Sequence, residues 1–562
     1  MKTKKSGWTR RKFLEVAAMS GVAAALPLSS VFASEPKKGG TLECGFAFLI
    51  QTPDPHRYTG TWARQFSAVA YEGLVTPTPV AERRRITMEQ GSDAVPDVQP
   101  MLAESWEIDQ DGKRYAFHLK KGVKFHNGKE MDSEDIKWNW LRIKDPRARS
   151  TNRVYVTKYL NSIDTPDKYT VVANLSQPYG AFLPANAWVN VPILPKDSIP
   201  EGVIWGWSKG FKPPTPAPPG TGPFVVKSYQ QKLGVEFERF DDYHVSGLPY
   251  LDKLHYRVIS QEQPRTMALR AGNVDYIYGA EPTWLNKIMQ NHMDKVFQPF
   301  EDQEVGLTFY PYKTDSIYTI YLNAHDQKAT PFKDVRVRKA LALCIDRDVL
   351  VKTLFGNLGV PMHDCFHEEI SPWSLPDIKW AARDIEKAKK LLAEAGYPNG
   401  LDVELKITPV WGLQEMASQI IQQMARPAGF RFTIVPMIGV QYVQSRIKYD
   451  YQAEIFLLGK EDPMQYFGQY FHTDAAYDGY GGTTGIKDPV MDELIDEMAA
   501  ETDTAKRKAK YRKVFQRVMD QAYVIPYGAT ITANVWSRKL KNMRPDKYFF
   551  PEQAFREAWL ES

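Results

Sequence analysis

The sequence has little cysteine, no dominant charge and, beyond its N-terminus, no long apolar run. Its 562 residues include only 3 Cys, too few for a fold held together by disulfides. No stretch of about 18 apolar residues follows the first 33 residues, so no membrane-spanning helix is expected in the body of the chain. An apolar fraction of 43% is too high for a disordered chain. At roughly 150 residues per domain, the length predicts three or four folded domains.

The net charge of +5 comes from the N-terminus alone. The first 33 residues hold six Lys or Arg and a single acid, Glu15, which leaves 66 basic and 66 acidic residues in the rest of the chain. A nucleic-acid-binding protein needs a basic face to meet phosphates. The neutral body gives no such indication, and we predict no nucleic-acid partner.

The N-terminus has the three parts of an export signal. Residues 1–12 are basic, residues 13–28 are weakly apolar, and Val31-Phe32-Ala33 offers small side chains for signal peptidase. Thr9-Arg10-Arg11-Lys12-Phe13-Leu14 matches the twin-arginine pattern. We predict export by the twin-arginine translocase, cleavage near Ala33 and a periplasmic location. A membrane-anchoring helix is the alternative, but the stretch is short and soft for one.

The body predicts an α/β protein whose early part is mostly β. Alternating and periodic apolar patterns give the expected elements. Strands are predicted at 39–46, 403–407 and 432–435, helices at 331–345, 385–395 and 511–522, an extended Pro-rich loop at 212–223, and a solvated loop around Arg83–Arg85.

Five segments, in order along the chain, resemble one family. They are Leu102–Trp106 with Gly122–Gly128, then Gly220–Phe224, Ala271–Asp275, Pro331–Ala340 with Ile345–Arg347, and Ala388–Tyr397. Together they resemble the family 5 periplasmic solute-binding proteins of ABC importers, the oligopeptide-, dipeptide- and nickel-binding class. Motifs such as Asp111-Gly112 and Asn127-Gly128 are turn signals that specify a fold and do not name a ligand.

The resemblance implies a two-lobed periplasmic binding protein (type II, cluster C) with an extra, mostly β domain and a ligand cleft between the lobes. Lobe I would comprise residues 39–76, 220–300 and 525–562, the extra domain 77–219, and lobe II 301–524. The chain would cross between lobes near Phe300 and Ile525, and closure would bury the ligand.

The resemblance leaves the ligand class open. In peptide-binding relatives a lobe II strand carries Arg, Trp and an amine-binding Asp before an Asp-Pro turn. Counting back from Pro463, these positions hold Ala453, Phe456 and Gly459, so the carboxylate is missing unless Glu461 replaces it. A peptide or peptide-like solute and an oligosaccharide or opine therefore both stay open. The implied ligand-binding residues are Tyr58, Trp62, Trp188, Trp373, Trp411, Phe456, Glu461, Asp462 and Tyr466.

Other chemistries are weaker readings of the sequence. The run His363-Asp364-Cys365-Phe366-His367-Glu368 gathers potential nickel or zinc ligands, but a polar loop at the cleft is favoured, and we predict no metal and no cofactor. A Cys344–Cys365 disulfide stays open. No Gly-x-Ser-x-Gly or His-Glu-x-x-His motif occurs, so we predict no enzyme, although Glu461 and Asp462 offer paired carboxylates.

By resemblance, the partners are a small solute or peptide and the membrane permease of an importer, and the protein is a monomer. A sensory receptor on the same fold, passing its ligand signal to another protein, is the remaining alternative.

Overall fold

A computed structural model describes residues 35–47, 52–57, 61–90, 96–205, 208–209, 212–314, 316–367, 371–408, 413–437, 440–459, 462–473, 484–545 and 551–561. The predicted signal peptide lies outside these residues. Lys38–Ser562 cluster as one unit, and the fold below is that unit.

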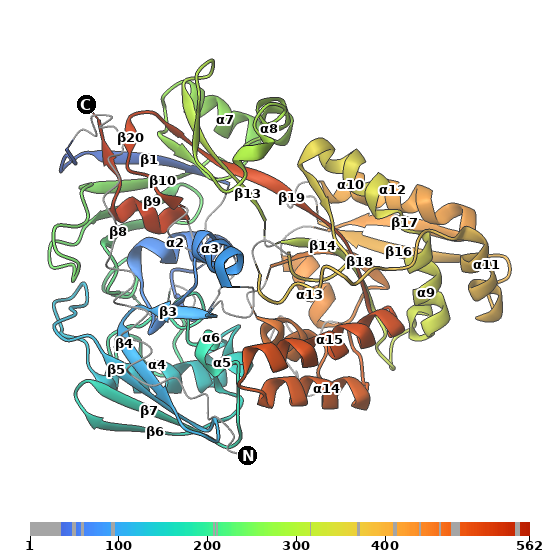
Figure 1. The fold of residues 1–562 in the computed structure, drawn as a ribbon, viewed down its shortest axis with the longest axis horizontal. Coiled ribbons are helices and arrows are strands. Elements are labelled where there is room, and N and C mark those ends of the chain that lie inside the picture. Colours follow the sequence, from blue (N-terminus) through green and yellow to red (C-terminus); the bar gives the residue numbers. More distant parts are fainter. Residues whose placement is uncertain are drawn as a thin grey trace. The chain divides into compact units, whose positions relative to one another are not determined.

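A mixed sheet of 13 described strands runs through the unit (Figure 1). Its central strand, β19 (Val524–Ser537), is 14 residues long and serves both halves of the sheet. On one side follow β14 (Ile317–Leu322), β18 (Ala453–Leu458), β16 (Leu401–Ile407) and β17 (Phe430–Pro436). On the other side follow β11 (Tyr276–Ile277), β1 (Thr41–Phe46), β10 (Lys253–Val258), β9 (Gly234–Arg239) and β8 (Phe224–Gln230).

Three further strands join the sheet around β19. β13 (Leu307–Lys313) and β15 (Gly359–Pro361) pair with β19, and β12 (Phe300–Asp302) pairs with β13. The partner of β19 changes over a short stretch. β14 pairs with β19 only as far as Gly528, and β13 pairs with β19 from Ile531 onward. The two halves are therefore joined through the β13–β14 connection and through β19 itself.

Residues 77–219, called here the β-rich segment, carry a separate sheet of four strands. Its order is β4 (Ala103–Ile108), β5 (Arg114–Leu119), β7 (Thr170–Leu175) and β6 (Leu160–Asp167), all antiparallel. Its helices are α3 (Val80–Gln90), α4 (Ser133–Lys144), α5 (Arg153–Thr157) and α6 (Phe182–Ala185). β3 (Val98–Pro100) pairs with β2 (Val75–Pro77), which leads into this segment.

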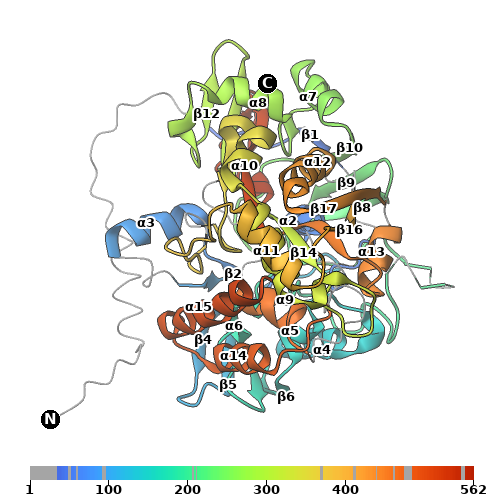
Figure 2. The same ribbon diagram turned by 90° about the vertical axis from the view of Figure 1, so that its right-hand side faces the viewer.

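Residues 301–524, called here the later segment, are rich in helices. They are α9 (Val335–Cys344), α10 (Arg347–Phe355), α11 (Ile385–Glu394), α12 (Gln414–Ala425), α13 (Val440–Ile447), α14 (Pro489–Ala500) and α15 (Thr504–Gln521). Outside both segments lie α2 (Thr61–Ala70), α7 (Glu262–Arg270), α8 (Pro282–Met289), the 3-10 turn Pro551–Arg556, and a short pair, β20 (Leu540–Lys541) with β21 (Trp559–Leu560). Figure 2 shows the helices of the later segment from the side.

The predicted α/β class and the listed helices and strands are confirmed. Local signals explain this success: Asp334 caps α9 and Asp384 caps α11, each accepting a backbone N–H of the first turn. The loop predicted around Arg83–Arg85 is wrong, since these residues lie on α3. That helix has no apolar stripe, so the periodicity on which the prediction relied is missing.

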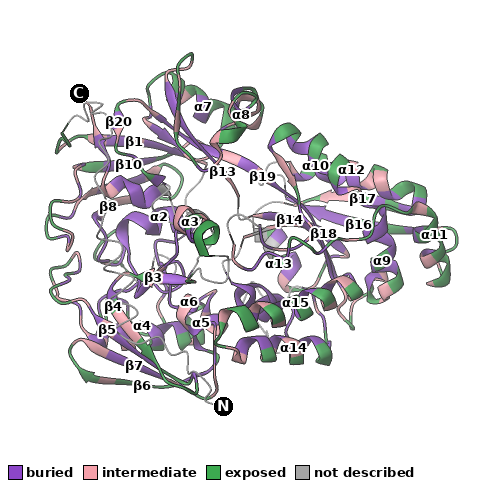
Figure 3. Cartoon of the chain, in the orientation of Figure 1, coloured by how far each residue is buried: buried purple, intermediate pink, exposed green. Residues whose placement is uncertain are grey.

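Buried residues are concentrated along the strands of the sheets, and exposed residues along the outer helices (Figure 3). One apolar cluster spans the β-rich and later segments, joining Tyr115 and Phe182 to Met498 and Phe515. The two segments are therefore in contact in this structure. The division into two lobes and an extra domain at the predicted boundaries remains a prediction.

A buried ion pair ties the β-rich segment to the start of the chain. Asp54 accepts two hydrogen bonds from Arg142 of α4, at 2.6 and 3.1 Å, and a third from the Trp205 backbone at 3.0 Å. Asp54 and Arg142 are both buried. Removing Asp54 would leave Arg142 buried without its carboxylate, which costs folding free energy. Asp54 therefore stabilises the fold.

We expect Asp54→Ala to lower the free energy of unfolding by about 3–5 kcal/mol, measured by urea unfolding. Asp241→Ala is the matched control, since Asp241 also pairs with an arginine, Arg239, but its side chain is 83% exposed. The control should change stability by less than about 0.5 kcal/mol. Equal losses in both variants would contradict the assignment.

Candidate functional site

The β-rich and later segments meet through buried polar groups. Gln465 Nε2 donates to Asn190 Oδ1 at 2.9 Å, and Asn152 Nδ2 donates to the same oxygen at 3.1 Å. Gln465 lies on a π-helical turn, Met464–Gly468, which follows the Asp462-Pro463 dipeptide. Asp462 Oδ1 accepts the Met464 N–H at 2.7 Å and so fixes this turn.

Asp462 is also half of a buried ion pair. Arg507 of α15 donates to Asp462 Oδ1 at 2.6 Å, with both side chains at most 2% exposed. The Arg507 guanidinium lies 4.8 Å from the centre of the Trp373 ring. Burial alone would lower the pKa of Arg507, but the nearby negative charges, Asp462 first and then Asp97, together raise it.

A small cavity lies beside this pair. Asp462 and Trp373 line it from the later segment, and Arg83, Asp97 and Asn190 are among the β-rich residues that line it. Its volume of about 10 Å³ is room for one water molecule. Charged groups of both segments therefore converge on a small enclosed space.

Two carboxylate oxygens at this cavity have no partner among the described residues, Asp462 Oδ2 and Asp97 Oδ1. Burial raises the pKa of Asp97 to about 6, with Asp462 adding to the effect and Arg507 and Arg83 opposing it. The negative charge of Asp97 is therefore undercompensated despite two nearby arginines. Buried acceptors in this condition favour a bound group that donates N–H or O–H.

A second group of side chains surrounds β18. Arg446 of α13 pairs with Glu454 at 2.8 Å and lies 3.5 Å from the centre of the Phe456 ring. Tyr321 packs edge-on against Phe456 and shares a 2.9 Å hydrogen bond with the hydroxyl of Tyr466. Burial raises the pKa of Glu454 to about 7, although Arg446 opposes the shift.

The structure brings some of the nine predicted ligand-binding residues together. Trp373 and Asp462 line the cavity, while Phe456 and Tyr466 meet through Tyr321. Trp188 is fully buried in the apolar cluster that the segments share. Tyr58, Trp411 and Glu461 lie outside the described residues, and of Trp62 only its backbone on α2 is described. Contact of these residues with a ligand stays a prediction.

Sequence reasoning missed Arg83, Asp97, Asn190, Arg446 and Arg507. Arg507 stands in a helix with four other basic residues between Thr504 and Lys513, and nothing in the local pattern marks it as the buried one. Asp97 precedes a strand of only three residues. No motif could have found either residue.

Within the described part of the run, 363–367, Asp364 and His363 have separate surroundings. Asp364 accepts the Leu375 N–H at 2.6 Å and the Ser374 hydroxyl at 3.2 Å, so it closes its own loop. The His363 ring faces Arg347 and Lys379, and burial together with these cations lowers the pKa of His363 to about 4. Within the described ranges, no three His, Cys, Asp or Glu side chains gather as a metal site. All three cysteines are free.

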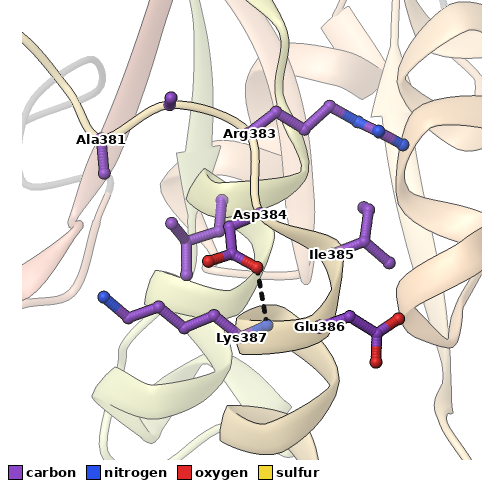
Figure 4. A pocket seen from close by; sticks show the side chains of 8 residues that line it. Ala381, Arg383, Asp384, Ile385, Glu386 and Lys387 are labelled. Atoms are coloured by element: carbon purple, nitrogen blue, oxygen red, sulfur yellow. Dashed lines mark hydrogen bonds between the residues drawn. The ribbon is translucent and has the colours of Figure 1, made fainter.

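A larger hollow lies elsewhere on the later segment, between the end of α9 and the start of α11 (Figure 4). It measures about 570 Å³ and is open to solvent. Asp384 there accepts the Lys387 backbone N–H at 2.9 Å, which is a helix cap. Arg383 donates to the backbone oxygens of Cys344 and Met424. Among the predicted ligand-binding residues whose side chains the structure describes, none lines this hollow.

Comparison with known families decides the relationship. The sequence profile of the bacterial extracellular solute-binding proteins, family 5 (middle region), matches residues 97–478. The chain belongs to this family. The resemblance drawn from the five motifs is thereby confirmed, and the role it implies is that of a solute-binding protein.

Relatives in this family cover most of the chain. Heme-binding protein A of Haemophilus influenzae is 26% identical over 474 residues, 80% of this chain and 81% of its own length. Glutathione-binding protein GsiB of Escherichia coli K12 is 26% identical over 487 residues, 84% of this chain and 80% of its own length.

Solved structures of family 5 proteins share the fold. AppA from Bacillus subtilis in complex with a nonapeptide has a TM-score of 0.76 at 20% identity, covering 94% of this chain and all of that chain. The binding protein AgaA from A. tumefaciens R10 in complex with agropinic acid has a TM-score of 0.75 at 24% identity, covering 93% and 99%. The predicted two-lobed α/β class is confirmed. No helix in the described part of this chain is long and apolar enough to span a membrane.

We expect the unfavourable charge of Asp97 to be visible in the pH dependence of stability. Its pKa in the folded protein lies above the ordinary 3.8, so the free energy of unfolding falls as pH rises from about 4 to about 6. Asp97→Asn removes the ionisable group and stays neutral at every pH. The variant should be about 1–3 kcal/mol more stable than wild type near pH 7 and equal to it near pH 4.

Urea unfolding at the two pH values measures this difference. Asp111→Asn is the control, because Asp111 is an exposed turn residue. A destabilised Asp97→Asn variant at pH 7 would show that Asp97 is a favourable anion and contradict the account.

Proposed function

We propose that the chain is the solute-binding component of an ABC importer. It captures a peptide or peptide-like solute between its two lobes and delivers it to the membrane permease, without chemical turnover. The twin-arginine translocase exports it, the leader is removed near Ala33, and the mature protein works in the periplasm as a monomer. Lobe I is residues 39–76, 220–300 and 525–562, the extra domain 77–219, and lobe II 301–524.

The observation that carries the solute class is the pair of unpartnered carboxylate oxygens, Asp97 Oδ1 and Asp462 Oδ2. They come from opposite segments and line one cavity. Buried acceptor oxygens without a hydrogen-bond donor favour a solute that brings N–H groups, such as a peptide. The relatives named for glutathione and the nonapeptide complex agree with this class.

An oligosaccharide or opine is the second candidate. Gly459 stands where peptide-binding relatives carry their amine-binding carboxylate, and AgaA was solved with agropinic acid. Phe456, at the Trp position, is covered on one face by the Arg446 guanidinium. Because Arg446 already pairs with Glu454, this candidate is supported by Gly459 and by AgaA alone.

Native mass spectrometry of the mature protein, purified under mild conditions, tests the proposal. We expect a bound mass that releases peptides or a peptide conjugate when fragmented. A single opine or glycan would overturn the peptide class and keep the transport role. Conversion of the released compound on incubation with fresh protein would overturn the transport role itself.

A further inference from the structure

The end of helix α14 meets the β-rich segment at one glycine. Gly180 donates its backbone N–H to the Ala499 carbonyl at 2.9 Å. A Cβ on Gly180 would lie 1.7 Å from the Glu501 carbonyl oxygen and 2.7 Å from its carbon. Both are backbone atoms at the end of a helix, so neither can swing aside.

Glycine is required here only by the opposite segment. Gly180 is not among the residues with positive φ, so its own backbone would accept an alanine. None of the three atoms nearest to that Cβ belongs to the β-rich segment, since they are atoms of Glu501 and Thr502. Alanine at this position would therefore clash first with the backbone at the end of α14.

The contact also completes the end of α14. The last four carbonyls of a helix have no partner within it. Lys510 Nζ donates to the Glu497 carbonyl at 3.1 Å, and Gly180 supplies the donor for Ala499 from the other segment. The helix is capped across the interface.

An ion pair lies next to this cap. Asp496, also on α14, accepts from Lys158 and from the Tyr159 hydroxyl, each at 3.2 Å. A hydrogen bond from His472 and the charge of Lys158 hold the pKa of Asp496 down at about 2, so this carboxylate is charged at neutral pH. Gly112 of the β-rich segment also lies close to this helix end. A Cβ on Gly112 would lie 2.7 Å from the Thr502 methyl group.

This contact lies away from the strands that join the two halves. In Figure 1, β13 and β19 cross the upper middle of the molecule, whereas α14 lies at its lower side. A rotation about the joining strands would move the segments farthest apart there. The cap and the ion pair would both break in such a movement, and water would replace them.

We propose that Gly180 is a positioning residue for solute capture. Its contact with Ala499 and Glu501 forms when the lobes close and sets how far they close. This rests on the proposed function, since it assumes that the segments separate and rejoin around a solute.

The test is a distance measurement on the full mature chain. Spin labels are placed at Leu141→Cys on α4 and Val490→Cys on α14, which are 49% and 48% exposed. The native Cys44 and Cys344 are buried and Cys365, which is partly exposed, is replaced by Ser. Electron–electron distance distributions are recorded without solute and with reduced glutathione and a tripeptide mixture as probes.

We expect a short-distance population in the wild type and its reduction by about tenfold or more in Gly180→Ala. Lys158→Met should reduce it less, because the ion pair is removed without a wedge. Lys168→Met is the matched control, since Lys168 pairs with Glu130 inside the β-rich segment. Gly128→Ala, at a turn with positive φ and open space around its Cβ, should lower stability and leave the distances unchanged.

Two results would overturn the proposal. One is a short-distance population that persists in Gly180→Ala. The other is a wild type that shows only the short distance in every condition, together with a lower melting temperature of Gly180→Ala. The contact would then be permanent packing and would not form on closure. Failure of the proposed function gives a different result. Fresh protein would convert a released solute, while Gly180→Ala would still lose the short-distance population relative to the wild type.

Discussion

One strand, β19, holds both halves of the large sheet together. The first half of β19 pairs with β14 and β15, and its second half pairs with β13 and β11. Backbone hydrogen bonds of a continuous strand hold both halves of the sheet at once, so the halves cannot shift independently except where the partners change. That change falls between Gly528 and Ile531. A Cβ on Gly528 would lie 2.4 Å from a methyl group of Val351, so α10 packs directly on this stretch.

The interface between the β-rich and later segments combines an apolar cluster with buried polar groups. Gln465 with Asn190, Lys158 with Asp496, and the carboxylates at the cavity all lie between the β-rich and later segments. Buried charges gain little net stability over apolar packing, because desolvation offsets their attraction. Polar side chains can be hydrated again at a small cost in free energy, which suits an interface that opens and closes. Apolar residues such as Met498 and Phe515 add area to the same interface and favour its closed arrangement.

The sequence allowed the fold to be predicted where its signals are local. Caps at Asp334 and Asp384 and the apolar stripes that follow them set the helices, and the motif order identified the family. It did not allow the interface to be predicted. The charged neighbours of Arg83 predict a solvated loop, yet Arg83 lines the cavity. Asp97 and Arg507 acquire their roles only from contacts made between distant parts of the chain, which no local pattern encodes.

We propose that the two lobes close on a solute about the changeover in β19, between Gly528 and Ile531. Small-angle X-ray scattering of the mature protein tests it most directly, by comparing protein purified with its solute and the same protein after the solute is removed by unfolding and refolding. The account predicts a larger radius of gyration without solute and a return to the smaller value when the solute is added back. Identical scattering in both states would contradict closure as the means of capture.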